Sequence, residues 1–142
     1  KQGVCEWLRI RVKEAAQRMG YKTPVYEEKE KAIQLTYAEK AESYIETNYS
    51  YPITVEEIAS YVGISRSHLF RSFQNYMNRS PKEYLTEYRI KQACRLLRET
   101  DLSVSAIAYS VGFENNLYFS KAFRKQKGES PSEYRKSRVR KI

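Results

Sequence analysis

Cysteine, histidine and long apolar segments are scarce in this sequence of 142 residues. Its two cysteines, Cys5 and Cys94, have a spacing that fits neither a disulfide framework nor a zinc module. With one histidine and no glycine-rich phosphate loop, the sequence predicts no enzyme active site, no cofactor and no metal. No run of eighteen apolar residues is present, which excludes a membrane-spanning helix.

The N-terminus shows no signal peptide, and the first residue is Lys1 rather than methionine. We therefore expect a reducing, cytoplasmic setting and a chain that is a piece of a longer protein.

Positive charge is in excess and unevenly distributed. The chain has 26 Lys and Arg against 17 Asp and Glu, a net charge of +9. Residues 1–50 carry nine basic and eight acidic side chains, a net of +1, whereas residues 51–142 carry seventeen and nine, a net of +8. Such an excess is typical of proteins that bind a polyanion, either nucleic acid or an acidic membrane surface. A basic protein whose charge serves only solubility is the alternative.

Two segments share one pattern at a spacing of 49 or 50 residues. TVEEIASYVGIS, from Thr54, matches SVSAIAYSVGFE, from Ser103, and SPKEYL, from Ser80, recurs as SPSEYR, from Ser130. The spacing changes from 49 to 50 just after Gly112, where a turn would tolerate one inserted residue. The repeat predicts two similar structural units in tandem.

Each unit has the pattern of a short helix, a glycine turn and a second helix. Thr54 and Ser103 are the expected N-caps of the first helices, and apolar positions 55, 58, 59 and 62 share one helical face. Gly63 is expected to end the first helix and Ser65 to cap the second. The buried side of that second helix is expected to contain Leu69, Phe73 and Tyr76. Two such units predict an all-α chain with two helix-turn-helix subdomains.

A long helix is expected to join the two units. It starts with Pro81 at a first-turn position, and its apolar side contains Leu85, Ile90, Ala93, Cys94 and Leu97. About seventeen residues correspond to roughly 26 Å at 1.5 Å per residue, and helices in successive major grooves lie about 34 Å apart. We expect a first subdomain at residues 35–80, the connecting helix at 81–98, and a second subdomain with a basic tail at 99–142.

The second unit fits the pattern I-A-x-x-V-G-F, followed by Y-F-x-x-x-F-(K/R)-x-x-x-G-x-(S/T)-P-x-x-Y-R. The matching residues are Ile107, Ala108, Val111, Gly112, Phe113, Tyr118, Phe119, Phe123, Arg124, Gly128, Ser130, Pro131, Tyr134 and Arg135. In this pattern the chain resembles the DNA-binding region of the AraC/XylS family of transcription regulators. The resemblance covers about residues 35–142.

The resemblance implies a seven-helix AraC-type DNA-binding domain with two recognition helices in adjacent major grooves. It also implies a sequence-specific transcription regulator whose partners are double-stranded DNA and RNA polymerase, usually with a separate sensing or dimerising domain. The alternative is a helical protein-interaction module whose basic charge gives only non-specific nucleic-acid binding. The signal (a small ligand or phosphorylation), the operator sequence and the sign of regulation stay open.

The outward face of the first recognition helix supplies one set of candidate DNA contacts. Arg71 lies one turn beyond Ser67, and its guanidinium is suited to O6 and N7 of guanine. A phosphate contact or a solvated face is the alternative for Arg71. Phe70 is expected to pack on a thymine methyl group. The set consists of Arg66, Ser67, Phe70, Arg71, Gln74 and Asn75.

The second recognition helix supplies the corresponding set. Asn116 and Lys121 are the candidates for base contacts, whereas Arg124 and Lys125 are candidates for phosphate contacts. Leu117 departs from the polar or small residue that the family often has, so its contact would be to a thymine methyl group. The set consists of Asn115, Asn116, Leu117, Ser120, Lys121, Arg124 and Lys125.

Helix starts and isolated residues complete the prediction. Helix N-termini capped by Thr54, Ser65 and Ser103 are candidate phosphate contacts through their main-chain amides. The tail RKSRVRKI has five basic residues in eight, and it is either a further DNA contact or a frayed end. His68 is expected to be a packing residue and Cys94 a core residue.

The first thirty-four residues carry a separate pattern. A short heptad stripe contains Cys5, Leu8, Val12, Ala15 and Met19, and residues 20–34 have the composition of a linker with Pro24 and a charge run. We interpret the stripe as the last helix of a sensing region; a dimerisation helix or a helix docked on residues 35–142 are the alternatives. Two heptads bury little apolar area, so we expect the fragment to be monomeric and any dimer to form through upstream residues.

Overall fold

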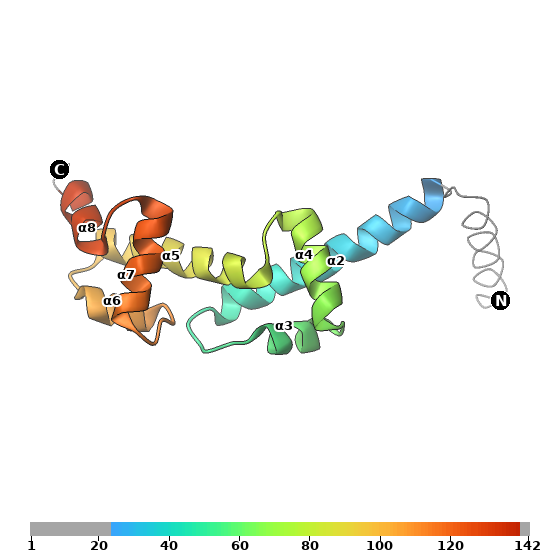
Figure 1. Cartoon of the computed structure of the whole chain (residues 1–142), viewed down its shortest axis with the longest axis horizontal. Helices are drawn as coiled ribbons and strands as arrows, with labels where there is room; N and C mark the ends of the chain where they lie inside the picture. The colour runs from blue at the N-terminus through green and yellow to red at the C-terminus, as the bar shows by residue number, and fades with distance from the viewer. Residues whose placement is uncertain (1–23, 140–142) are drawn as a thin grey trace.

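Residues 24–139 are described by a computed structural model, and within this range the chain forms seven helices and no strand (Figure 1). The helices are α2 (Pro24–Asn48), α3 (Val55–Val62), α4 (Arg66–Met77), α5 (Pro81–Glu99), α6 (Val104–Ser110), α7 (Asn116–Lys127) and α8 (Pro131–Val139). The prediction of an all-α fold with two helix-turn-helix units and a connecting helix is confirmed. The predicted stripe from Cys5 to Met19 lies outside the described residues.

The first unit is formed by α2, α3 and α4, which enclose their own apolar core. The core contains Ala41, Ile45, Ile58, Ala59, Val62, Leu69, Phe73 and Leu85. Ala59 is only 4% exposed because α3 packs on its neighbours at this position, where a larger side chain would keep the helices apart. Tyr76 was predicted to be inward-facing; it is half-buried, and its hydroxyl donates to the main-chain oxygen of Lys31 (2.8 Å).

The second unit repeats this arrangement with α5, α6, α7 and α8. Its separate core contains Ile90, Ala93, Cys94, Leu97, Ile107, Ala108, Val111, Phe113, Phe119, Phe123 and Tyr134. Cys94 is buried in it, as predicted. The connecting helix α5 therefore serves both units: its first turns give Leu85 to the first core, and the rest of its apolar side lines the second.

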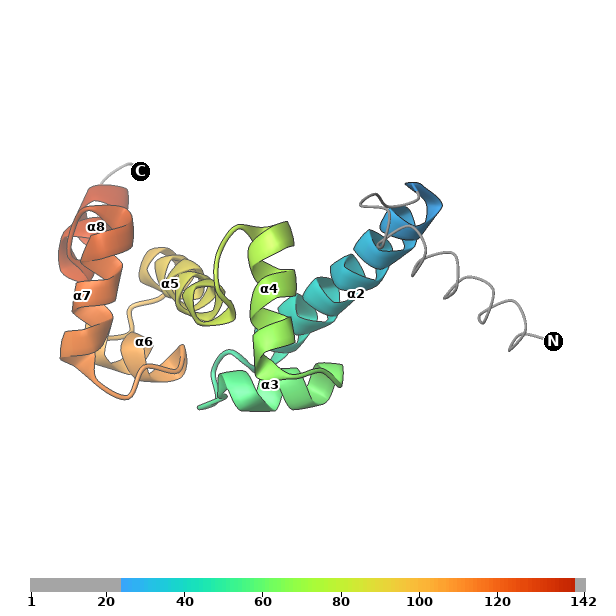
Figure 2. The same cartoon turned by 45° about the vertical axis from the view of Figure 1, so that its right-hand side comes forward.

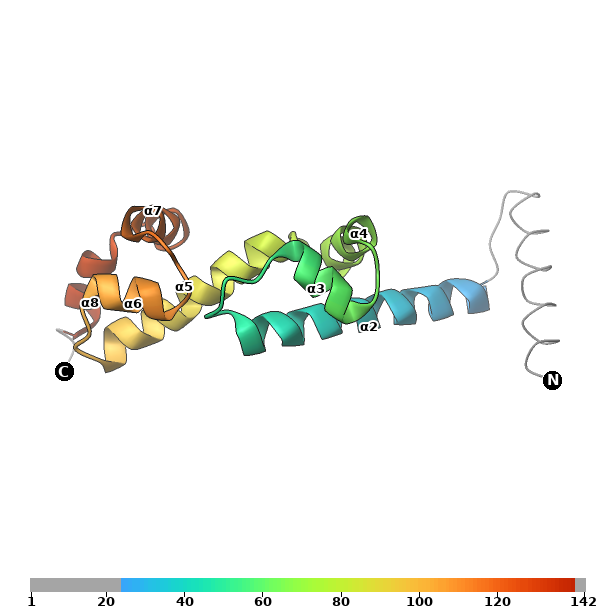
Figure 3. The ribbon, with the colours of Figure 1, turned by 90° about the horizontal axis from the view of Figure 1, so that it is seen from below.

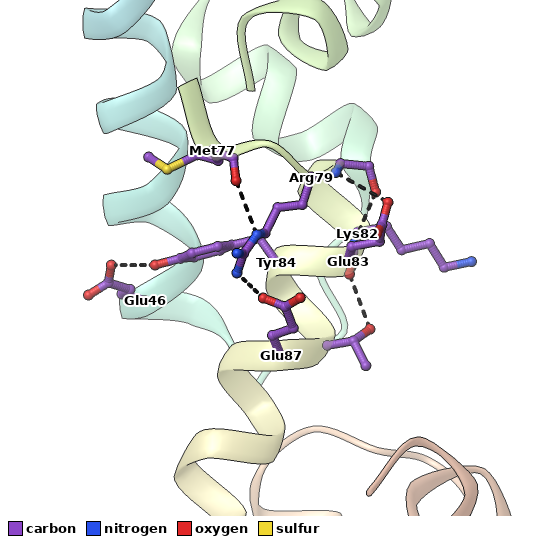
Figure 4. Close-up of polar contacts among 9 residues, drawn as sticks. Glu46, Met77, Arg79, Lys82, Glu83, Tyr84 and Glu87 are labelled. Atoms are coloured by element: carbon purple, nitrogen blue, oxygen red, sulfur yellow. Dashed lines mark hydrogen bonds and ion pairs between the residues drawn. The ribbon is translucent and has the colours of Figure 1, made fainter. Parts of the chain in front are cut away.

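The start of α5 is fixed by local hydrogen bonds (Figure 4). The Ser80 hydroxyl accepts from Glu83 N (3.1 Å), and the Glu83 carboxylate accepts from Ser80 N (3.3 Å), which is a complete capping box. One turn further, the Tyr84 hydroxyl donates to Glu46 of α2 (2.9 Å). The Ser-Pro pair at 80–81 thus begins the connecting helix and ties it to the first unit.

Helix α2 corrects the prediction of a linker. Residues 24–34 are helical and continuous with the rest of α2, so the helix crosses the boundary that we predicted at residue 35. Pro24 occupies the first position of the helix, where its missing N–H costs nothing and its fixed φ suits the helix. The charge run that indicated a linker consists of Glu and Lys, which are also strong helix formers.

The two recognition helices, α4 and α7, point the same way. In Figure 2 both run upward from the level of α3 and α6. Figure 3 shows both nearly end-on and on the same side of α2 and α5. The repeat in the sequence therefore corresponds to two helix-turn-helix units whose second helices run in the same direction.

Candidate nucleic-acid interface

The turn that precedes α4 follows from two residues. Gly63 ends α3 with φ of +88°, a conformation that residues with a Cβ rarely adopt, and its N–H donates to Ala59 O (2.9 Å). Ser65 then caps α4, because its hydroxyl accepts from His68 N (3.1 Å). Both were predicted from the sequence, and both are confirmed.

The turn that precedes α7 is longer. Gly112 has φ of +102°, Phe113 is buried, and Asn115 caps α7 by accepting from Leu117 N (2.7 Å) and Tyr118 N (3.1 Å). The Asn115 side chain, predicted to face the groove, is therefore engaged in starting the helix. In the sequence repeat, at a spacing of 50 residues, Asn115 corresponds to Ser65, the N-cap of α4. The repeat therefore already indicated that Asn115 caps α7.

The predicted DNA-contacting face of α4 is solvent-exposed. Leu69, Ser72 and Phe73 are buried, and the six predicted contact residues, Arg66, Ser67, Phe70, Arg71, Gln74 and Asn75, are all exposed. Phe70 is the one apolar residue among them, and it is 49% exposed.

The corresponding face of α7 is exposed with one exception. Asn116, Leu117, Lys121, Arg124 and Lys125 are exposed, and Leu117 shows 64% of its surface to solvent. Ser120 is half-buried, because its short side chain lies at the border beside the buried Phe119. The Asn116 amide donates to the hydroxyl of Ser105 on α6 (3.3 Å).

Two of the predicted arginines pair with carboxylates. Arg66 contacts Glu56 (2.7 Å) across the first turn, and Arg124 contacts Glu133 (3.1 Å) on α8. The pKa of the Glu133 carboxyl is lowered, first by the Ser130 hydroxyl, and then by the Ser130 N–H and Arg124. Both pairs are exposed, so they contribute little to stability and their arginines are available to exchange a carboxylate for another anion.

Arg71, Lys121 and Lys125 lie in a different electrostatic setting. Among the described residues none of the three has a carboxylate within 4 Å. Their charges are therefore not neutralised by an ion pair in residues 24–139. Arg71 nevertheless lies beside acidic residues, because it lines an open cleft of about 380 Å³ together with Glu27 and Glu30 of α2.

The N-terminal half of α2 supports α4, which the sequence did not predict. The Gln34 amide lies 2.8 Å from His68 Nε2 and accepts a hydrogen bond from the Ser72 hydroxyl. His68 also packs edge-on against Tyr37, with ring centroids 5.2 Å apart, as expected of a packing residue. Because Ser72 is fully buried, Gln34 supplies the polar partner that it needs inside the unit.

Between residues 24 and 139, no group of three or more His, Cys, Asp or Glu side chains is placed to hold a metal ion. No helix in that range is long and apolar enough to cross a membrane.

The sequence pattern of a family described as a helix-turn-helix domain matches residues 58–137, which is more than half of the chain. The chain is also similar to the lactose operon transcription activator of Staphylococcus xylosus, with 46% identity over 95 residues, covering 67% of this chain and 34% of the relative. The matched region spans only about a third of the length of such curated relatives.

Two solved structures share the fold. One is a transcriptional regulator with an AraC-type DNA-binding domain from Chromobacterium violaceum, with 33% identity, a TM-score of 0.70, and coverage of 75% of this chain and 96% of that one. The other is the DNA-binding domain of the global transcriptional factor AdpA in complex with target DNA, with 30% identity, a TM-score of 0.70, and coverage of 73% and 95%. The chain belongs to the AraC family of helix-turn-helix regulators, and the matched residues 58–137 lie in an AraC-type DNA-binding domain.

Proposed function

We propose that the chain binds duplex DNA by placing α4 and α7 in two successive major grooves on one face of the double helix. The common direction of α4 and α7 on one side of the molecule carries this proposal (Figure 3). The 19 residues of α5 span roughly 28 Å at 1.5 Å per residue. With the flanking turns, this length suits the spacing of about 34 Å between successive grooves.

Base recognition would then divide between polar and apolar side chains. Arg71 of α4 and Lys121 of α7 donate to guanine O6 and N7, and Asn116 contributes a further base contact. Phe70 and Leu117, both exposed apolar residues on the two faces, pack on thymine methyl groups. Such a contact would remove the apolar surface of both side chains from water, which is favourable.

Phosphate contacts would hold the two helices in register. Lys125, Arg124 and Arg66 supply the charge, and the two arginines exchange Glu133 and Glu56 for phosphates. The main-chain amides behind the caps Thr54, Ser65 and Ser103 add neutral donors. Gln74 and Asn75, near the end of α4, and Ser67 and Ser120 complete the set of contacts.

For the whole protein we propose a transcription activator that acts in the cytoplasm and contacts RNA polymerase. The Staphylococcus xylosus relative is a transcription activator of an operon, which supports this sign of regulation. The signal is either a small ligand or phosphorylation. We propose no catalytic role for the described domain, because its family is described as a helix-turn-helix domain and the solved structures it resembles are DNA-binding domains of regulators.

Anisotropy titration of the 142-residue chain against labelled duplexes tests DNA binding. A random-sequence duplex and an enriched duplex from a selection should be compared at two salt concentrations. We expect log K to fall steeply with log salt for both duplexes, with an added sequence-dependent affinity for the enriched one. Absence of binding even at low salt would favour a protein-interaction module instead.

A further inference from the structure

Arg89 lies in the middle of α5, and its side chain contacts both units. Its Nε donates to the main-chain oxygen of Tyr49 (2.7 Å), and its Nη2 donates to that of Tyr51 (2.9 Å). Both carbonyls belong to the segment between α2 and α3, so these two hydrogen bonds bind the Arg89 side chain to the first unit. A guanidinium provides two parallel donors in a fixed plane, which a lysine cannot.

The other side of the same guanidinium faces the second unit. Its central carbon lies 5.9 Å from the ring centroid of Phe113, within the range of a cation–π contact. Next to it, a Cβ on Gly112 would lie 2.6 Å from Tyr49 O and 2.8 Å from Arg89 Nε. Gly112 and Phe113 form the turn that precedes the recognition helix α7, so this turn is packed directly on the loop of the first unit.

Within residues 24–139 the two units share little apolar packing. Their apolar cores are separate, and apart from α5 itself the residue that packs against both is Tyr49. A helix alone permits bending and twisting between the domains at its two ends. The cluster of Arg89, Tyr49, Gly112 and Phe113, which we call the junction, restrains that motion.

We propose that Arg89 is a positioning residue that sets the orientation of α7 relative to α4, and thereby the spacing of the two base blocks that the chain accepts. This inference rests on the proposed function, since it requires both helices to bind one duplex. Arg89 stays charged at neutral pH although burial lowers its pKa, so its two hydrogen bonds are kept under binding conditions.

The expected consequence is a strict spacing rule. When two DNA-binding units are rigidly joined, binding of the second unit costs little further entropy, provided that its base block lies at the spacing set by the junction. Each inserted base pair moves the second block by about 3.4 Å and rotates it by roughly 35°, given 10–10.5 base pairs per turn. A rigid junction cannot follow that rotation, whereas a loosened junction can.

The experiment compares the wild-type chain with Arg89→Gln, Arg89→Lys and the control Arg95→Gln on duplexes with zero, one or two base pairs inserted between the blocks. Arg95 is exposed on the same helix and pairs with Glu99, so its substitution changes the charge equally without touching the junction. For the wild type and Arg95→Gln we expect about a tenfold or greater loss with two inserted pairs. For both Arg89 variants we expect weaker binding to the optimal duplex, and less than about a threefold further loss on insertion. Full retention of spacing discrimination in Arg89→Lys would overturn the inference.

A second measurement decides the question without DNA. Residual dipolar couplings of the ¹⁵N-labelled wild-type chain should fit one alignment tensor for α2–α4 and α6–α8 together. In Arg89→Lys the two units should require separate tensors, while melting curves show that both are folded. A single tensor in the variant would refute the positioning role even if DNA binding is established. If the variant required separate tensors but neither it nor the wild type bound DNA, the proposed function would be refuted, whereas the role of Arg89 in fixing the orientation of the two units would stand.

Discussion

Tyr84 packs edge-on against Phe73 with ring centroids 5.4 Å apart, and Tyr134 repeats this contact with Phe123 at the same 5.4 Å. The interplanar angles, 69° and 77°, are also similar. Each tyrosine is the last residue of one copy of the repeated Ser-Pro-x-Glu-Tyr motif. In both copies a serine caps the helix after the hairpin, and the tyrosine one turn later covers the hairpin's core.

Replacing either tyrosine by leucine removes this ring contact. We expect Tyr84→Leu and Tyr134→Leu each to lower the free energy of unfolding by about 1–3 kcal/mol. Both hydroxyls make a hydrogen bond, to Glu46 and from Arg98 respectively, so the loss should be larger at Tyr134 because it is buried (6% exposed) whereas Tyr84 is half-buried. Urea unfolding followed by circular dichroism measures both, with Tyr109→Leu, at a residue 79% exposed, as the control. An equal loss at Tyr109 would contradict this account.

Gly112 and Gly63 both have positive φ but differ in their surroundings. A Cβ at Gly63 meets nothing within 4 Å. Gly63→Ala should therefore lower the free energy of unfolding only through the strain of a positive φ, by about 1–2 kcal/mol. Gly112→Ala should cost about 1–3 kcal/mol more, because its Cβ would lie 2.6 Å from Tyr49 O. Thermal melting of the two variants tests the difference. Equal melting temperatures would show that the turn before α7 is not packed on the first unit.

Glu42 gives the fold a pH dependence. Burial, and then the hydrogen bond and charge of Glu46, raise the pKa of the Glu42 carboxyl above its ordinary value of 4.5. The folded state therefore holds this proton more tightly than the unfolded state does, and that stabilisation is fully present below pH 4.5 and lost as the pH rises through the folded-state pKa.

Glu42→Gln should accordingly raise the melting temperature at pH 7, and the gain should shrink towards zero near pH 4. Glu28→Gln, an exposed position on the same helix, is the matched control for the loss of one negative charge. If the gain at pH 7 persisted unchanged in acid, or appeared equally in Glu28→Gln, the effect would not come from the partly buried Glu42 carboxyl.

Base and phosphate contacts should separate by mutation. Arg71→Ala should cost about 1–3 kcal/mol on the enriched duplex and relax the preference at one position. Lys125→Ala should weaken all duplexes similarly and reduce the salt slope by about one. Lys91→Ala, an exposed lysine on α5, serves as the control. Equal weakening of enriched and random duplexes by Arg71→Ala would assign Arg71 to phosphate instead.

The units were predictable because their boundaries depend on local chemistry. Thr54, Ser65 and Gly63 act through neighbouring main-chain groups, so the sequence alone reveals them. The N-terminal half of α2 was missed because Pro24 and a Glu/Lys run fit a linker and an exposed helix equally well. Contacts that settle the matter, such as Gln34 with His68, join residues 34 positions apart.

The candidate interface was predictable to the extent that it follows helical periodicity. The exposed faces of α4 and α7 emerge from the repeat once the buried residues are removed. Ion pairs between side chains do not follow from helical periodicity. The pair between Arg124 and Glu133, nine residues away on another helix, could therefore not be predicted from the sequence. The junction around Arg89 was also missed, because its partners are main-chain oxygens 38 and 40 residues away.

Hydroxyl-radical footprinting of the enriched duplex, at one chain per duplex, tests the central claim of two recognition helices in successive grooves most directly. The account predicts two protected blocks on one face of the DNA, about 10 base pairs apart and unrelated by a two-fold axis. Protection confined to one groove per chain, or an inverted repeat that requires two chains, would contradict it.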